Sequence, residues 1–251
     1  MTTVPENLKD DILQEIPHQQ IPSVLEMLKK DWPASILIYN YIKNFWDWEC
    51  KDSSRKCHVL IPHGSWECGT VILIVPYVCQ LQQSLLQYSL YTVAVYSPPE
   101  DHGYLERVLC TTNWIDWENP SYILFPGMLP SHKEAVMAAV KFRRLRLPIH
   151  TTQCLAYWMP HGKAAQLTMR CPLEVYIGPL NESHLDTVIS HWEYGSQETR
   201  ALILNLLRLN TCLGLYLATN HQLVAWVLST EYGVGVLHTI GTSSETRLRS
   251  T

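Results

Sequence analysis

The sequence predicts an α+β protein with two halves, each a mixed, mostly antiparallel sheet with flanking helices. Runs rich in Val, Ile and Tyr alternate with segments of helical apolar spacing along all 251 residues. Residues 161–172 are polar, bounded by Pro and Gly, and have no apolar period, which is typical of a link between domains. We therefore expect domains at 1–160 and 173–251, joined by residues 161–172.

Two short helices are expected first. The first, closed by Pro17, has apolar residues at helical spacing: Leu8, Ile12, Leu13 and Ile16. The second, ended by Pro33, has the same kind of stripe: Ile21, Val24, Leu25 and Leu28. Runs with strand composition follow at 35–41, 57–61, 70–75, 91–96 and 152–159. Ser131 and Glu134 form a capping-box pattern that predicts the start of a helix carrying Ala135, Val136, Ala139 and Val140.

The second half has a clearer pattern. Residues 173–180 have strand composition, and Asn181 is placed to cap a helix with Leu185, Val188, Ile189 and Trp192 on one face. Ser196 is placed to cap a further helix at 197–209. Three strands joined by hairpin-length turns are then expected at 213–218, 223–229 and 234–240. The order is strand, helix, helix and an antiparallel meander.

Composition and charge exclude several classes of protein. Hydrophobic residues make up 47% and charged residues 17% of the chain, which is globular and not disordered composition. A formal net charge of −4 gives no global signal for nucleic acid. The basic run Lys141, Arg143, Arg144 and Arg146 is interpreted first as a solvated helix end, with a CoA phosphate, an acidic partner or RNA as alternatives. The longest apolar run, 71–78, contains Pro76 and is too short to cross a bilayer.

The eight cysteines form no C-x-x-C pair, and the acidic N-terminus lacks a signal-peptide pattern. Reduced, mostly buried thiols in an intracellular protein are therefore expected. One group of potential metal ligands lies close together in sequence: Cys50, Cys57, His58, His63 and Cys68. Zinc needs four such ligands, but these spacings match no common finger, so no metal is expected.

The residues narrow the fold further. The second half is similar to the first two-thirds of the GNAT acyltransferase fold, and the whole chain resembles the glycine N-acyltransferase family, which joins a degenerate amino-terminal half to a catalytic GNAT-like half. In the first half the likeness rests on "WPASILIY" (32–39), "VYSPPEDHGYLERVLCTTNWIDW" (95–117) and the Glu134 helix leading into "TQCLAYWM" (152–159). In the second half it rests on "LNESHLDTVISHWEYGSQETR" (180–200), "NTCLGLYL" (210–217) and "LVAWVL" (223–228) with the final strand.

The resemblance implies an acyl-CoA-dependent N-acyltransferase acting on the amine of glycine or a similar amino acid. Acyl-CoA is then a co-substrate, a carboxylate or ordered water takes the amine proton, and a backbone N–H of the fourth strand polarises the thioester carbonyl. By resemblance, Glu198 is the base, and Leu237, His238, Thr239 and Ile240 contact the cofactor. Two plainer alternatives stay open: Glu198 as an acid that favours a helix N-terminus, and His238 as a packed side chain.

The ending "GTSSETRLRST" (241–251) differs from the family pattern, in which an Arg- and Gly-containing loop holds the CoA pyrophosphate and opens a helix. The sequence thus predicts an incomplete C-terminal half that stops at the cofactor loop. Two alternative functions stay open. The chain could be a catalytically impaired relative that acts as a binding protein, or an enzyme that acetylates another amine. The family implies a mitochondrial location, with the cytoplasm as the alternative, and the pattern leaves the oligomeric state open.

Overall fold

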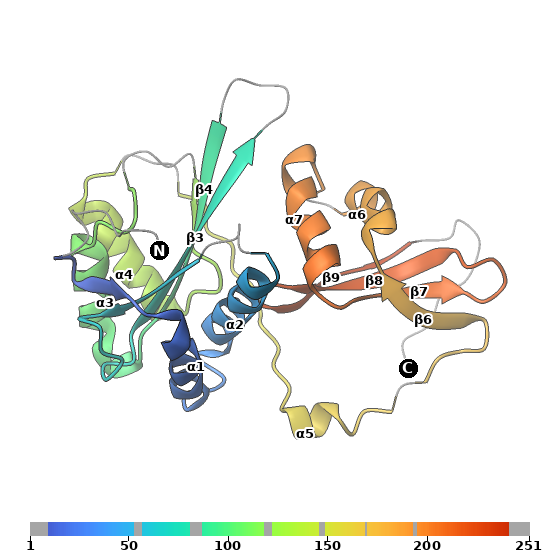
Figure 1. Ribbon diagram of the computed structural model, residues 1–251, viewed down its shortest axis with the longest axis horizontal. Helices are drawn as coiled ribbons and strands as arrows, with labels where there is room; N and C mark the ends of the chain where they lie inside the picture. Colours follow the sequence, from blue (N-terminus) through green and yellow to red (C-terminus); the bar gives the residue numbers. More distant parts are fainter. Residues whose placement is uncertain are drawn as a thin grey trace. The chain divides into compact units, whose positions relative to one another are not determined.

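The structure, a computed structural model, describes residues 10–52, 57–80, 87–117, 122–145, 149–168, 170–192 and 195–240. It divides into two compact units, 1–158 and 159–251. The sequence placed the end of the first domain at residue 160 and expected a separate linker at 161–172. In the structure these residues belong to the second unit and include the short helix α5, His161–Ala164 (Figure 1).

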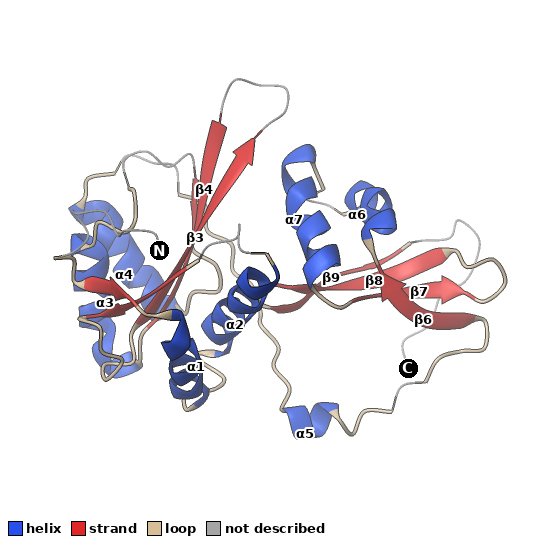
Figure 2. Ribbon diagram, in the orientation of Figure 1, coloured by secondary structure: helices blue, strands red, loops and turns tan. Residues whose placement is uncertain are grey.

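Unit 1 is built on a five-stranded sheet in the order β1-β2-β3-β4-β5 (Figure 2). The strands are β1 (Leu13–Glu15), β2 (His58–Pro62), β3 (Val71–Gln80), β4 (Gln87–Tyr96) and β5 (Tyr122–Leu124). All neighbouring pairs are antiparallel except β4 and β5, which are parallel. The expected strands at 57–61, 70–75 and 91–96 are therefore confirmed.

Helices of unit 1 bury both faces of this sheet. One face packs on α3 (His102–Thr111) and α4 (Pro130–Phe142), through a core that includes Ile72, Val93, Leu105 and Val136. The other face is buried too, since Val71, Leu73 and Val75 alternate with Ile72 and Ile74 and all five are at most 3% exposed. Here α2 (Ile36–Lys51) contacts β3 and β4, and α1 (Ile21–Lys29) packs on α2. Strands covered on both sides are apolar at consecutive positions, as β3 is from Val71 to Val75.

Unit 2 contains a four-stranded antiparallel sheet in the order β6-β7-β8-β9. Its strands are β6 (Val175–Leu180), β7 (Cys212–Leu217), β8 (Leu223–Thr230) and β9 (Gly233–Thr239). The helices α6 (Leu185–His191) and α7 (Gln197–Leu209) lie on one side of it (Figure 1). That side holds the buried side chains: Val188, Ile203, Leu206, Trp226 and Leu228.

Both predicted helix caps of unit 2 are present. The Asn181 side chain accepts a hydrogen bond from the Ser183 N–H, at the start of a 3₁₀ turn (Glu182–His184) that leads into α6. Ser196 caps α7: its hydroxyl accepts from the Thr199 N–H, while the Thr199 hydroxyl accepts from the Ser196 N–H. Each pair satisfies N–H groups that have no partner within the helix.

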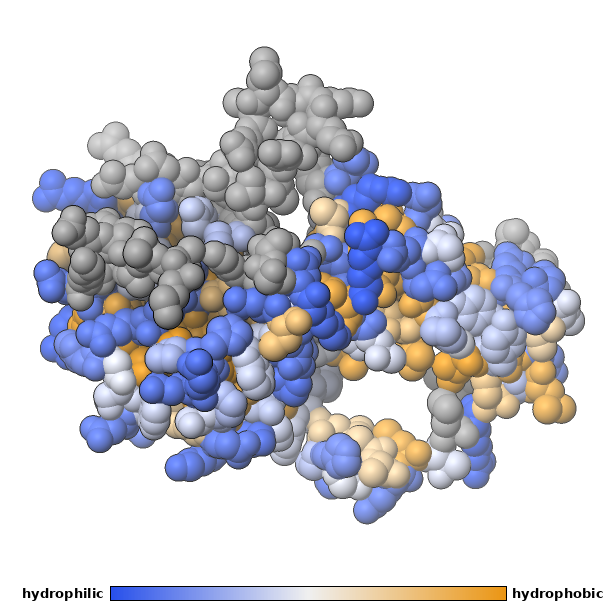
Figure 3. All heavy atoms as spheres, viewed as in Figure 1, coloured by the Kyte–Doolittle hydropathy of each residue, from blue (hydrophilic) through white to orange (hydrophobic). Residues whose placement is uncertain are grey.

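The opposite face of this sheet is open. It carries Ile177, Leu213, Leu215, Val227 and Leu237, which we call the open sheet face. Ile177 and Leu213 are 40% exposed and Leu237 is 76% exposed. Figure 3 shows apolar residues at the surface of unit 2 on the side of the sheet away from α6 and α7. An exposed patch of this kind often marks a binding surface.

Two segments of the first half have a different secondary structure from the one that the sequence predicts. Residues 35–41 were expected as a strand but begin α2, in which Ile38, Tyr41, Ile42, Phe45 and Trp48 follow the helical period and are all buried. Burial of this longer stripe outweighs the local strand propensity.

Residues around Leu13 were expected in a helix but form β1, while Leu8 lies outside the described residues. The buried Asp11 carboxylate accepts hydrogen bonds from the Leu13 N–H, the Thr112 hydroxyl and the Asn113 N–H. The two bonds from Thr112 and Asn113 are long-range, and with the pairing of β1 to β2 they hold the chain extended.

The expected strand at 152–159 is also wrong: this segment has no regular structure and is exposed almost throughout. A strand needs a neighbour for its main-chain hydrogen bonds. Within the described chain, none of these residues makes a backbone–backbone hydrogen bond.

Two smaller expectations are corrected. The helix α4 begins at Pro130 after Leu129, so Ser131 lies inside it and makes no cap. Proline at the first helical position has no N–H to leave unpaired, which explains the earlier start. The thiols are not mostly buried: of the described cysteines only Cys212 is buried, while Cys50, Cys154 and Cys171 are exposed.

Candidate functional site

The last described strand, β9, forms one edge of the unit 2 sheet and is irregular. Its pairing with β8 shifts register between Trp226 and Leu228, and Val236 has a φ of 48°. A β-branched residue in the left-handed region is an unusual, strained conformation. Bulges and strained residues of this kind concentrate near functional sites, so β9 is a candidate location for such a site.

Backbone direction at the end of β9 leaves one N–H facing outward. The Ile240 N–H donates to the Val224 carbonyl at 2.8 Å, towards β8. Successive residues of an extended strand direct their N–H groups to opposite sides. The N–H of Thr239 therefore points to the outer edge, where a ligand can accept from it.

A cluster of three rings lies on the helical side of this strand. The imidazole of His238 stacks on the Trp226 indole, with ring centroids 4.7 Å apart and an angle of 26° between their planes. His191, at the end of α6, contacts both, at 5.9 Å from Trp226 and 5.7 Å from His238. The indole is 2% exposed and its buried N–H has no partner among the described residues. A buried, unpaired donor is costly, and a polar ligand here would satisfy it.

His191 is held in a defined orientation. Its Nδ1 lies 2.8 Å from the Thr187 carbonyl, which can only accept, so Nδ1 carries a proton and, in a neutral ring, Nε2 is the acceptor. A neutral imidazole with a bare Nε2 is able to accept a proton from a bound amine.

Glu198 is the second residue of α7, directly after the Ser196 cap. Its backbone position in the first turn agrees with either of its two interpretations, base or dipole-stabilised acid. The position and contacts of its side chain lie outside the described part of the chain, so its role as a base stays a prediction.

The four residues expected to contact a cofactor divide between the two faces of the sheet and its edge. His238 is half-buried on Trp226, and Leu237 is 76% exposed on the open sheet face. Thr239 is exposed, and Ile240 pairs its N–H with β8. Sequence reasoning missed His191 and Trp226, because neither shares a motif with His238. Their common position on one face appears only when α6 packs on the sheet.

The other sequence candidates do not form sites in the described residues. No group of three or more His, Cys, Asp or Glu side chains there is arranged to hold a metal ion, and this includes the described members of the Cys50–Cys68 region. Arg143 of the basic run donates to the Thr112 carbonyl and lies 5.6 Å from the Trp117 ring, which is a structural role.

The tail, 241–251, lies outside the described residues. No described helix is long and apolar enough to cross a membrane.

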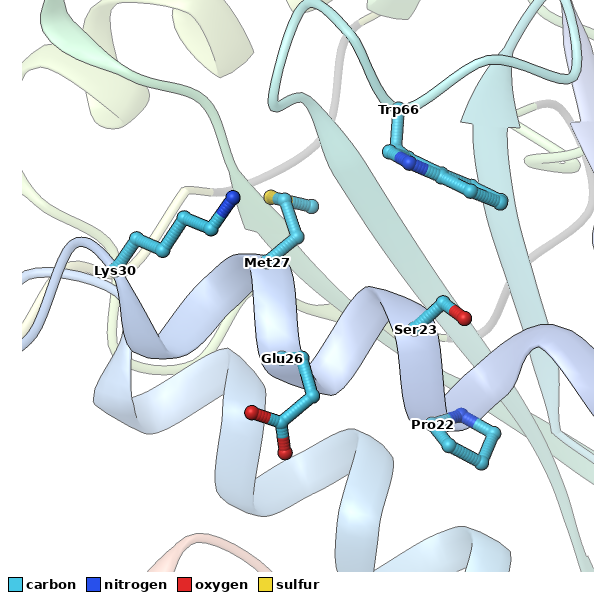
Figure 4. A pocket seen from close by; sticks show the side chains of 6 residues that line it. All are labelled: Pro22, Ser23, Glu26, Met27, Lys30 and Trp66. Atoms are coloured by element: carbon cyan, nitrogen blue, oxygen red, sulfur yellow. The ribbon is translucent and has the colours of Figure 1, made fainter.

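A shallow pocket in unit 1 has a volume of about 370 Å³. It lies between α1 and Trp66 and is lined by Pro22, Ser23, Glu26, Met27, Lys30 and Trp66 (Figure 4). Figure 4 shows the Glu26 carboxylate pointing away from Lys30 and Trp66. None of the residues expected in a site lines it, and its one aromatic and two charged groups do not converge on a common point.

Comparison with known proteins supports the fold. No protein-family model matches the chain, and no curated protein matches it significantly. A solved X-ray structure of a Drosophila protein, a structural genomics target whose description gives no function, superposes with a TM-score of 0.72 at 20% sequence identity. The match covers 92% of this chain and 78% of the Drosophila chain. At this identity the likeness extends to the fold, a mixed α+β architecture, as expected from the sequence.

Proposed function

We propose that this chain is an acyl-CoA-dependent N-acyltransferase that transfers an acyl group directly to the amine of glycine or a similar amino acid, as in the glycine N-acyltransferase family. The observation that carries the proposal is the edge of β9. It combines a bulge, an outward N–H at Thr239 and the ring cluster of His191, Trp226 and His238. Unit 2 also has the order of strand, two helices and meander that is similar to the first two-thirds of the GNAT fold.

The first chemical requirement is polarisation of the thioester carbonyl. Negative charge develops on its oxygen as the amine attacks, and a fixed N–H donor stabilises that charge. The Thr239 N–H supplies such a donor at the strand edge. The acyl chain then lies along β9, where exposed Leu237 offers apolar contact.

The second requirement is removal of a proton from the attacking ammonium group. Glu198 is the base that the family resemblance implies, at the capped start of α7. His191 is a second candidate, because its Nε2 is an acceptor and its ring lies beside His238. A carboxyl group ordinarily loses its proton at lower pH than an imidazolium, so the two candidates predict different pH profiles: a carboxylate base acts from lower pH.

Two assays test the proposal. Titration calorimetry measures the binding of CoA and a series of acyl-CoAs. A thiol-release assay then measures turnover with glycine, other amino acids and simple amines. Thr239→Pro removes the outward N–H, and loss of one such donor lowers kcat by about 10²–10³-fold in a catalytic site. Thr239→Val keeps the N–H and serves as the matched control, with near-normal kcat expected. An unchanged kcat in Thr239→Pro contradicts the role of this N–H.

Two further variants assign the base. Glu198→Gln removes a carboxylate base, and His191→Gln removes the imidazole while keeping a polar side chain. The variant that loses the acid-side limb of the kcat profile identifies the base. Micromolar CoA binding without thiol release favours the alternative of an impaired relative that binds without turnover. Thiol release with amines other than amino acids favours an enzyme with a different acceptor. If the chain does not bind CoA at millimolar concentration, both enzymatic functions are overturned, the amino-acid acyltransferase and the enzyme with a different acceptor.

A further inference from the structure

The shallow pocket of unit 1 has the dimensions of a small-molecule site. Its volume of about 370 Å³ lies within the range of ligand pockets, and it is bounded by α1 on one side and by Trp66 on the other. The helix α1 buries one stripe: Ile21, Val24, Leu25 and Leu28. The residues at the intervening positions therefore face outward, and they form the helical wall of the pocket.

The opposite wall is a tryptophan in an ordered loop. Trp66 is partly buried, and Figure 4 shows its indole nearly edge-on, with one ring face directed towards Ser23 and α1. Two backbone hydrogen bonds of 3.0 Å fix the loop: the Ser65 N–H donates to the Pro62 carbonyl, and the Gly69 N–H donates to the Trp66 carbonyl. A ligand between helix and indole thus meets a preformed aromatic surface, and little ordering of the protein opposes its binding.

Of the two charged residues that line the pocket, one is already paired. The Glu26 carboxylate accepts a hydrogen bond from Lys29 Nζ at 2.5 Å and points away from Lys30 and Trp66 (Figure 4). Lys30 forms no ion pair with any described residue, and Figure 4 shows its side chain extending towards Met27. The pocket therefore combines an unpaired ammonium group with an apolar and aromatic surface.

These groups are spread along a groove, which sets the shape of the ligand. An α-helix rises about 1.5 Å per residue, so Lys30 lies about 10 Å from Ser23 along α1, with Met27 between them. A flat, apolar body of about two fused rings occupies most of this length, and a carboxylate at its end reaches Lys30. A cationic ligand finds no such partner, because the carboxylate of Glu26 is paired with Lys29.

We propose that this pocket binds a small monocarboxylate with a flat aromatic body, held by an ion pair to Lys30 and by contact of its rings with Met27 and Trp66. Both parts of the ligand are needed, since an exposed ion pair contributes little by itself in water. The inference is independent of the proposed enzymatic function, because its residues belong to unit 1 whereas the proposed reaction lies at β9 in unit 2.

The test uses naphthalene-2-carboxylate as the probe, added to the full chain at low ionic strength. Indole N–H signals in proton–nitrogen correlation spectra report binding, and Trp66→Phe identifies the Trp66 signal by its loss. We expect a saturable shift of this signal with a Kd of about 1 mM, because the probe is small and the pocket shallow. Naphthalene-2-carboxamide has the same shape without the charge, and it should bind about three- to fivefold more weakly.

Paired variants separate the two kinds of contact. Lys30→Gln should weaken binding of the carboxylate by about three- to fivefold and leave that of the carboxamide unchanged, whereas Lys133→Gln, at an exposed lysine of α4, should change neither. Trp66→Leu should weaken both probes by at least about fivefold, followed through the Met27 methyl signal. Trp158→Leu changes a tryptophan outside the pocket that is 43% exposed, and normal binding is expected.

Reversal of the charge is the sharpest test. Lys30→Glu places a carboxylate at the end of the groove, so this variant should lose naphthalene-2-carboxylate and gain 2-naphthylmethylammonium. We expect the Kd of that cation to fall by at least about threefold relative to the natural chain. Unchanged indole signals of the other tryptophans show that each variant is folded.

Three outcomes overturn the proposal. One is the absence of a saturable shift of the Trp66 signal up to about 10 mM probe in the natural chain. Another is equal affinity for the carboxylate and the carboxamide, or equal weakening by Lys30→Gln and Lys133→Gln, since either contradicts the ion pair. The third is undiminished binding to Trp66→Leu, which places the probe elsewhere on the surface.

Discussion

Unit 1 buries both faces of its sheet, whereas unit 2 buries one. In β3 the five residues from Val71 to Val75 are all at most 3% exposed, because helices lie on both sides. In β7 buried positions alternate with exposed or partly exposed ones, with Cys212 at 2% and Leu213 at 40%. Yet both strands are apolar at consecutive positions. The composition of β7 resembles that of a strand covered on both faces, but within the described residues of unit 2 one face is covered by α6 and α7 (Figure 1) and the other is partly exposed.

This difference separates stability from interaction. Apolar residues of unit 1 stabilise the fold, because burial removes them from water. Apolar residues on the open sheet face and at the β9 edge remain in water. They therefore add little to the stability of the fold and are available for binding. The four predictions that follow test this contrast.

The largest effect is expected from truncating equivalent leucines of the two sheets. Leu73→Ala in unit 1 leaves a cavity at a fully buried site and should lower the free energy of unfolding by about 2–5 kcal/mol. Leu213→Ala in unit 2 starts from a side chain that is 40% exposed and should lower it by less than about 1 kcal/mol. Hydrogen exchange of the β3 and β7 amides measures each unit separately. Equal losses would mean that the open sheet face is covered.

A second effect concerns the junction between α6 and α7. A Cβ added at Gly195 would collide with the backbone carbonyls of Ile189 and Trp192, which have little room to move. Gly195→Ala is therefore expected to destabilise unit 2 by about 1–3 kcal/mol and to disturb the start of α7.

Gly103, in α3, is the matched control for that change. Nothing lies within 4 Å of an added Cβ there, so Gly103→Ala should stabilise unit 1 by about 0.5–1 kcal/mol through helix propensity. Urea unfolding followed by hydrogen exchange compares the two. A neutral Gly195→Ala would show that the junction relaxes easily.

Helix caps provide a smaller effect in which the two units differ. Ser196→Ala removes the cap of α7 and should destabilise unit 2 by about 1 kcal/mol. Ser131→Ala changes a serine that the sequence also predicted to open a helix, but α4 begins before it, so almost no loss is expected. Thermal unfolding by calorimetry measures both. A loss at Ser131 as large as at Ser196 contradicts the observed start of α4.

The smallest effect is electrostatic and lies at the surface of unit 2. A hydrogen bond from Arg208 at 2.7 Å lowers the pKa of Glu182 below its usual value. Since the folded pKa is depressed, any stabilisation is present above the unfolded pKa and is lost as the pH falls through the folded pKa. Both side chains are about half exposed, so the effect on stability is slight. A carboxyl NMR titration should show the Glu182 pKa rising in Arg208→Gln and unchanged in Arg200→Gln.

Predictability from the sequence also differs between the units. In unit 2 the local signals agree with one another: Asn181 and Ser196 cap helices as expected, and three strands follow at the expected places. In unit 1 long-range contacts override local propensity. Residues 35–41 were expected as a strand, but burial of the apolar stripe from Ile38 to Trp48 stabilises the helix α2. The residues around Leu13 were expected as a helix, but the hydrogen bonds of Asp11 stabilise the strand β1.

The candidate site shows the same limit. The sequence brought His238 and Thr239 to attention through a family resemblance, because they fall on the fourth strand of unit 2. It gave no sign of His191 or Trp226, since ring contacts across α6, β8 and β9 depend on packing. The bulge and the positive φ of Val236 have no local signature either, because valine disfavours that conformation.

By itself, then, the sequence determined the mixed α+β class, the division near residue 160 and the caps and strands of unit 2, since these depend on periodicity and short-range hydrogen bonds. Only the tertiary structure decided which faces are covered. Burial depends on which elements meet: apolar residues are buried on both faces of β3 from Val71 to Val75, whereas β7 is buried on one face and partly exposed on the other. The same reason explains residues 152–159: strand composition forms a strand only when a neighbour offers main-chain partners, and within the described chain none does.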